Sequence, residues 1–181
     1  MKRRQFTGAL LATPLLAQAQ TDALATRLVA GACVVMIRHA QTEPGIGDPP
    51  GFRLDRCSTQ RNLSAEGQTQ AERIGQWFKS RGLTPSAVQS SAWCRCKDTA
   101  DLAFGRHQVW PALNSFFGEY RTRDAQTAQL RAALKAMPAG KFEIWVTHQV
   151  NMTALTGQGM AMGEALVLDV TGTVLARSTF P

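Results

Sequence analysis

Two arginines and two histidines in this sequence have the chemistry to bind and attack a phosphoryl group. Arg38 and His39 directly follow one apolar run, His148 directly follows another, and Arg95 lies in the segment SSAWCRCKDTA. Arginine presents a planar fork of donors that matches phosphate oxygens. A histidine with one unprotonated ring nitrogen is a nucleophile. Phosphoryl transfer depends mainly on positioning and charge stabilisation, so this set predicts such a reaction.

The elements that would position these residues alternate between strands and helices. Apolar runs bounded by turn residues indicate strands, and apolar positions spaced three or four apart indicate helices. The predicted strands cover residues 33–37, 87–90, 142–147, 165–170 and 173–177, and the predicted helices begin near residues 62–64, 91 and 124. This order favours an α/β fold, a three-layer α/β/α sandwich with a mostly parallel sheet that the final hairpin makes mixed.

In open α/β sheets, ligands bind beyond the carboxyl ends of the strands. His39 and His148 each stand at such an end, and Arg95 falls in the first turn of a helix that follows a third strand. We therefore expect them to meet, with Arg38, Thr42, Arg95 and His148 binding the phosphate and His39 attacking it. A helix N-terminus beside Arg95 would add backbone N–H donors.

Four segments of the sequence also resemble the histidine phosphatase superfamily, which has the phosphoglycerate-mutase-like fold. They are RHAQT, QRNLSAEGQTQA, SSAWCRCKDTA and VTHQ, in this order along nearly the whole chain. The resemblance implies that His39 is the phosphorylated nucleophile and that Arg38, Arg95 and His148 bind the phosphoryl group. It also implies a single α/β/α domain that uses no metal.

The sequence departs from two branches of that superfamily. Cofactor-dependent mutases have Gly and Glu after the Arg-His pair, where this chain has Ala40 and Gln41. The acid-phosphatase and phytase branch has Asp as proton donor directly after the second histidine, where this chain has Gln149. A mutase is therefore disfavoured, and any general acid must come from another position.

Glu119 is the first candidate for that acid, because flanking aromatic residues could bury it partly and favour its protonated form. Asp124 fits better as the N-cap of the third helix. Glu43 lies close to the nucleophile but in a loop that is expected to point away. The absence of a dedicated donor is a further alternative, because a phosphohistidine or an activated ester would not require one.

Metal and cofactor chemistry is not expected. No histidine lies three or four positions from another, and no acidic cluster accompanies them. The formal charge of +7 is not organised into runs, which disfavours a nucleic-acid partner and suits a phosphorylated small molecule. The oligomeric state is left undetermined.

Residues 1–19 have the form of a signal peptide: a basic start, a short apolar stretch and the cleavage-site pattern Ala-Gln-Ala. Arg3 and Arg4 could belong to a twin-arginine export signal. The mature domain would be residues 20–181, periplasmic and not stably associated with the membrane. Cys33 lies in the first apolar strand and is expected to be a buried thiol. In that oxidising compartment Cys57 could then pair with Cys94 or Cys96.

Some residues keep two interpretations. Arg61 could be a surface charge or a substrate contact, and His107 is expected to be a surface bystander. The aromatic residues of the loop 109–120 could belong to the core or wall the pocket. The predicted function is a periplasmic phosphatase acting on a phosphomonoester or a protein phosphohistidine. The alternative is an inactive phosphate-binding or sensing protein of the same fold.

Overall fold

The structure, a computed structural model, describes residues 23–180. The predicted signal peptide therefore lies outside the described residues. A helix covers residues 23–30 and precedes the first strand. The strands are β1 (Cys33–Arg38), β2 (Ala87–Ser90), β3 (Gln108–Val109), β4 (Phe142–Thr147), β5 (Ala165–Asp169) and β6 (Val174–Ser178). The longer helices that follow them are α2 (Ala65–Lys79), α3 (Cys94–Phe104), α4 (Arg123–Lys135) and α5 (Gln149–Thr156).

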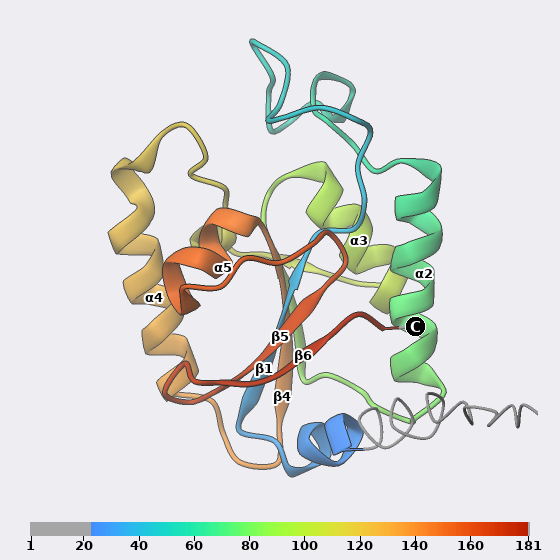
Figure 1. Ribbon diagram of the computed structural model, residues 1–181, viewed down its shortest axis with the longest axis vertical. Coiled ribbons are helices and arrows are strands. Elements are labelled where there is room, and N and C mark those ends of the chain that lie inside the picture. Colours follow the sequence, from blue (N-terminus) through green and yellow to red (C-terminus); the bar gives the residue numbers. More distant parts are fainter. Residues whose placement is uncertain (1–22, 181) are drawn as a thin grey trace, which may run out of the picture.

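The six strands form one mixed sheet in the order β3-β2-β4-β1-β5-β6 (Figure 1). Strands β3, β2, β4 and β1 run parallel to one another. Strand β5 runs antiparallel to β1, and β6 runs antiparallel to β5. The predicted mostly parallel sheet with a final hairpin is confirmed. Because the parallel strands share one direction, their carboxyl ends lie at one edge of the sheet.

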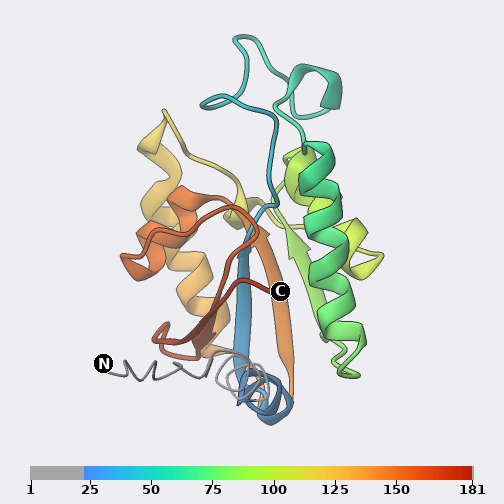
Figure 2. The same cartoon turned by 45° about the vertical axis from the view of Figure 1, so that its right-hand side comes forward.

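Helices cover both faces of the sheet, as Figure 2 shows, with α2 and α3 on one side and α4 and α5 on the other. Side chains alternate along β1 accordingly. Val35 and Ile37 pack into the cluster that contains the buried residues of α2 and α3, and Val34 and Met36 pack into the cluster of α4 and α5. The predicted three-layer sandwich is therefore confirmed.

Helix α2 begins where the sequence predicted, because Ser64 is its N-cap and accepts a hydrogen bond from the Gly67 N–H. Gly67 is required by packing. A Cβ atom there would lie within van der Waals overlap of the Gln41 carbonyl, so only glycine lets the helix approach the loop that follows β1. This close approach places the first turn of α2 beside the segment that contains His39 and Gln41.

Two helices were not predicted. Helix α5 has only eight residues, and buried Asn151 interrupts its apolar pattern, so the sequence 149–156 carries no clear helical stripe. The helix at residues 23–30 lies near the start of the mature domain that was predicted to begin at residue 20. Within the described residues, no helix is long and apolar enough to cross a membrane.

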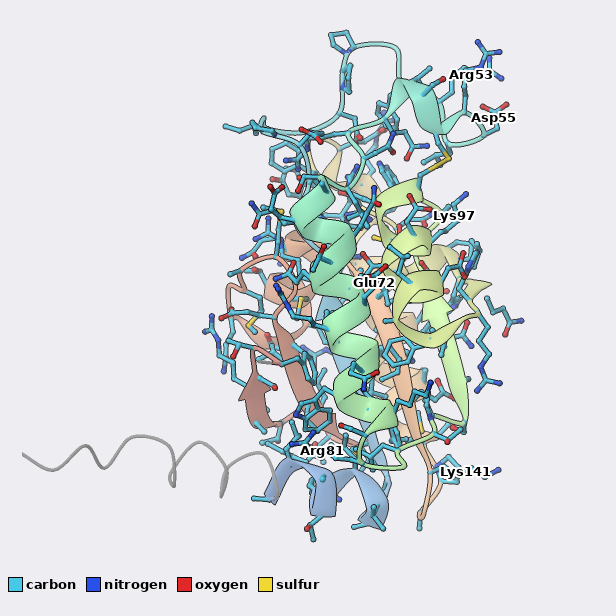
Figure 3. All side chains as sticks on the ribbon, turned by 90° about the vertical axis from the view of Figure 1, so that its right-hand side faces the viewer. Arg53, Asp55, Glu72, Arg81, Lys97 and Lys141 are labelled. Atoms are coloured by element: carbon cyan, nitrogen blue, oxygen red, sulfur yellow. A yellow bond between two sulfur atoms is a disulfide. The ribbon has the colours of Figure 1, made fainter. Side chains whose placement is uncertain are left out.

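The segment between β1 and α2 rises above the carboxyl edge of the sheet (Figure 1). A disulfide between Cys57 and Cys94 ties it to the start of α3 (Figure 3). This pairing decides between the two partners that the sequence allowed for Cys57. Cys96 remains a buried free thiol, and so does Cys33, as predicted.

Candidate active site

The carboxyl ends of β1 and β4 bring the two histidines together. His39 follows β1, His148 follows β4 as the N-cap of α5, and their ring centroids are 5.5 Å apart. Both rings are buried. Arg95 lies in the first turn of α3, as the sequence predicted. The residues expected to form one site therefore come from three separate parts of the chain.

The hydrogen bonds of His39 assign its proton. Its Nδ1 lies 2.9 Å from the carbonyl oxygen of Ala40, which can only accept, so Nδ1 carries the proton. Burial is the main cause that lowers the pKa of His39 to about 3, and the charges of Arg95 and Arg38 add to it. The ring is therefore neutral at neutral pH, and Nε2 keeps the lone pair that a nucleophile needs.

His148 is held by polar neighbours from β2 and the following segment. Its Nε2 lies 2.8 Å from the Ser91 hydroxyl, which in turn lies 3.3 Å from the amide oxygen of Asn114. Burial, followed by the effects of His39 and Arg95, lowers the pKa of His148 well below its usual value. When Nε2 accepts the Ser91 hydroxyl proton at this shorter contact, the neutral ring carries its own proton on Nδ1 and can donate one hydrogen bond from there to a bound oxygen.

Arg38 is positioned by neutral acceptors. One terminal nitrogen, Nη1, donates to the Met160 carbonyl at 2.6 Å and to the Gln149 side-chain oxygen at 3.1 Å. Gln149 also accepts from the Met160 N–H, so it fixes the backbone that holds the arginine. The Nε–H of Arg38 is buried and has no hydrogen-bond partner in the part of the chain that the structure describes.

Arg95 is positioned by a carboxylate. Its two terminal nitrogens donate to the two oxygens of Asp48 at 2.7 and 3.2 Å, and Nη1 also lies 3.3 Å from the Arg61 carbonyl. The side chains of Arg95 and Asp48 are only 4% and 7% exposed, so this is a buried ion pair. The Nε–H of Arg95, like that of Arg38, is buried and has no hydrogen-bond partner among the described residues.

Arg61 is a third arginine of the same site. Its Nη1 donates to the Gly45 carbonyl, and its Nε–H is also buried without a partner. Its positive charge lowers the pKa of both His39 and Arg38, although burial is the larger cause for each. Buried donors normally have partners, so three unpaired guanidinium N–H groups indicate a site shaped for an anion.

The sequence matches a family with this chemistry. Residues 34–166 match the family model of the histidine phosphatase superfamily (branch 1). The chain belongs to this superfamily. The match extends from β1 to β5 and includes all four residues first selected from the sequence.

Several solved structures are similar in fold to this chain. A protein assigned as phosphohistidine phosphatase SixA from Agrobacterium tumefaciens has 21% identity and a TM-score of 0.57, covering 81% of this chain and 97% of its own. SixA complexed with tungstate has 15% identity and a TM-score of 0.53, covering 80% and 95%. TTHB049 from Thermus thermophilus has 21% identity and a TM-score of 0.53, covering 80% and 98%. No curated protein matches the sequence.

Thr42 is buried three residues after His39, and its hydroxyl donates to the sulfur of Met162 at 3.6 Å. Thr99 has a clearer structural role. Its hydroxyl accepts from the Ala40 N–H at 3.0 Å and thereby connects α3 to the segment that carries His39. The predicted phosphate contact of Thr42 stays a prediction.

The expected partial burial of Glu119 is wrong. Its side chain is 66% exposed and pairs with Arg121 at 2.7 Å. The Glu119 N–H bonds to the Phe116 carbonyl in a turn in which Gly118 has φ +81°, so Phe116 enters the core and the acidic residue faces solvent. Glu119 thus lacks the burial on which its selection as proton donor rested.

The structure also places three other residues that the sequence analysis considered, and one of them, Asp124, differs from expectation. Asp124 is not the N-cap of α4, because Thr122 occupies that position and Asp124 lies within the first turn. Glu43 is exposed, as expected. His107 pairs with Asp101 on the surface, which agrees with its assignment as a bystander.

Sequence reasoning missed Asp48, Ser91 and Asn114. Most of the loop 44–52 is exposed, but the Asp48 side chain turns inward to Arg95. One signal could have identified Ser91: it directly follows β2, the third strand end at this edge. Among the residues that the structure describes, no group of three or more His, Cys, Asp or Glu side chains could hold a metal ion.

Proposed function

We propose that this protein hydrolyses a phosphomonoester or a protein phosphohistidine through a phosphohistidine intermediate on His39. One observation carries the proposal. The unprotonated Nε2 of a buried, neutral His39 is grouped with three arginines whose Nε–H donors have no partner among residues 23–180. Membership of the histidine phosphatase superfamily supports the same reaction class.

In the first step, the Nε2 lone pair of His39 attacks phosphorus, and the bond from phosphorus to the leaving oxygen or nitrogen breaks. In the second step, water attacks the phosphoryl group, the P–N bond to His39 breaks, and inorganic phosphate leaves. Arg38, Arg61 and Arg95 stabilise the charge on the equatorial oxygens in both steps. His148 donates to one of these oxygens.

The net charge of the site suits a dianion. Arg38, Arg61 and Arg95 contribute positive charge, Asp48 contributes one negative charge, and both histidines are neutral. The balance is an excess of about two positive charges, which matches the charge of about −1.5 to −2 on a phosphomonoester at pH 7.

Substrates with good leaving groups are favoured within this class. Burial alone would raise the pKa of the Asp48 carboxyl, but hydrogen bonds from Arg95 and from the Arg61 N–H lower it overall, so the group is ionised and a poor acid. The exposed Glu119 is not placed among the buried groups of the site. The names of the SixA neighbours support phosphohistidine as one such substrate.

We also propose that the enzyme works without a metal and acts in the periplasm after export. The Cys57–Cys94 disulfide supports an oxidising compartment. Chelator treatment that removed activity, with recovery on adding zinc or magnesium, would contradict metal independence. N-terminal sequencing of the exported protein tests cleavage after Ala19.

The decisive test uses a ³²P-labelled aryl phosphate with wild type and His39→Ala. Wild type should acquire acid-labile, base-stable label and release phosphate, and the variant should do neither while its melting temperature is retained. An active His39→Ala variant would overturn the assignment. Tight phosphate binding without turnover in wild type would instead indicate a phosphate-binding or sensing protein.

A further inference from the structure

Asp48 is the charged residue of the site whose role the reaction chemistry leaves open. It lies in the long loop between β1 and α2, and its carboxylate accepts from four donors on three residues. These are the two terminal nitrogens of Arg95, the Trp93 indole N–H at 2.9 Å and the Arg61 backbone N–H at 3.0 Å. Such a carboxylate could either compete with phosphate for Arg95 or hold Arg95 in place for it.

Counting the donors of Arg95 separates these two roles. A guanidinium has five N–H groups. Two from Nη1 point to Asp48 and to the Arg61 carbonyl, and one from Nη2 points to the other oxygen of Asp48. The second N–H of Nη2 and the Nε–H remain, and these two lie on the same edge of the guanidinium. Asp48 thus occupies one edge and leaves a complete pair of donors on another.

Arg38 follows the same plan with different partners. The Met160 carbonyl and Gln149 both accept from Nη1, and the edge formed by Nε and Nη2 has no protein partner in the described part of the chain. Because both arginines leave this same edge unpaired, the bidentate contact that arginine makes with phosphate remains possible at each with the protein contacts intact.

We propose that Asp48 is a positioning residue that holds Arg95 so that its Nε–H and Nη2–H face the phosphoryl group. The inference rests on the proposed phosphate site. Asp48 touches only Arg95, Arg61 and Trp93 through hydrogen bonds and acts through them. The carboxylate is ionised, because the hydrogen bonds from Arg95 and Arg61 lower its pKa against the opposing effect of burial.

The loop that carries Asp48 is itself fixed at the start of α3. The Cys57–Cys94 disulfide joins them, and the Cys94 N–H donates to the Gln60 side-chain oxygen at 2.9 Å. Arg95 is the next residue along the helix. The first turn of α3 therefore anchors the loop through Cys94 and binds the carboxylate of the loop through Arg95. The anchor holds the side chains of Asp48 and Arg95 in a fixed position relative to each other.

The test compares Asp48→Ala and Asp48→Asn with wild type. Inorganic phosphate binding is measured by calorimetry, and kcat and KM are measured with an aryl phosphate. Asp48→Ala should bind phosphate about tenfold more weakly, because the loss of a correctly placed charge-assisted contact from Arg95 outweighs the gain from removing one negative charge. Asp48→Asn, which keeps one acceptor oxygen, should show a smaller loss. If Asp48 competed with phosphate, both variants would bind it more tightly, and that result would overturn the proposal.

Asp55→Asn is the matched control. Asp55 lies in the same loop and also pairs with an arginine, Arg53, but its side chain is 69% exposed on the outer side of the loop (Figure 3). This variant should bind phosphate like wild type. A loss as large as that of Asp48→Ala would assign the effect to the loop in general and contradict a specific role of Asp48.

A double-mutant cycle with Arg95→Ala excludes a merely structural effect. If Asp48 acts through Arg95, Asp48→Ala should weaken phosphate binding little further in that background. An undiminished additional loss would refute positioning. Phosphate binding is measured without turnover, so an inactive wild type would reject the proposed hydrolysis and still leave the Asp48 inference testable.

Discussion

Arg38 and Arg95 reach the same pocket with different kinds of support. Arg38 ends β1 and is held by a backbone carbonyl and an amide oxygen, both uncharged and both near α5. Arg95 lies in the first turn of α3 and is held by a carboxylate from a long loop that a disulfide tethers. One half of the site therefore depends on the sheet and helix packing, and the other half depends on a loop contact.

The difference also affects the charge of the site. Neutral acceptors leave the full positive charge of Arg38 in the pocket, where burial and the charges of Arg61 and Arg95 lower its pKa. Asp48 cancels one positive charge and separates Arg95 from solvent at the same time. A carboxylate thus permits three arginines to lie together in a buried site with less mutual repulsion.

The largest effect is expected when either arginine is removed. Arg38→Ala and Arg95→Ala should each lower kcat/KM by about 10²–10³-fold, because each removes donors that stabilise the transferring group. Steady-state kinetics with an aryl phosphate would measure this. Lysine at either position should recover little, because an ammonium group cannot make the bidentate contact. Full activity of either lysine variant would contradict the assigned geometry.

Reduction of the disulfide should affect only the Arg95 half. Loss of the Cys57–Cys94 bridge should lower the free energy of unfolding by roughly 2–4 kcal/mol and weaken phosphate binding through Asp48. Urea unfolding and calorimetry with and without reductant would measure both changes. In Asp48→Ala, reductant should still lower stability but should not weaken phosphate binding further. A further loss of binding there would show that the bridge acts by another route.

Gln149→Glu would make the Arg38 half resemble the Arg95 half. A carboxylate there should keep the contacts to Arg38 and Met160 but add a negative charge, so phosphate binding should weaken by about tenfold. The exposed Gln158→Glu in the following loop is the control for a change of net charge. Equal effects in the two variants would mean that the contact to Arg38 is unimportant.

The two histidines should make stability depend on pH. In the folded chain the pKa of each histidine lies below its unfolded value of 6.5, and that of His39 is about 3. Below pH 6.5 the unfolded chain therefore binds protons that the folded chain does not. The free energy of unfolding should therefore fall as pH falls, by about 1.4 kcal/mol per pH unit for each histidine. Urea unfolding from pH 7 to 4 should show a shallower slope for His39→Asn. An unchanged slope would contradict a neutral buried His39.

The residues that the sequence identified by itself share one property: each stands at the end of a local pattern. An apolar strand ends at Arg38-His39 and another at His148, and a helix begins at the segment that contains Arg95. Strand direction and the position of a helix start follow from such patterns, so the sequence alone could predict that these residues meet. The choice of Cys57 as a disulfide partner also followed from a local pattern, because Cys33 lies in an apolar strand and was expected to be buried as a free thiol.

Only the tertiary structure decided which side chains surround them. Asp48 meets Arg95 across 47 positions, and Asn114 meets Ser91 across 23. Glu119 faces solvent because a turn buries Phe116 instead. Loops carry no periodic pattern that fixes the direction of a side chain. Their conformation depends on long-range contacts such as the Cys57–Cys94 bridge and the buried ion pair, which exist only once the sheet and helices have assembled.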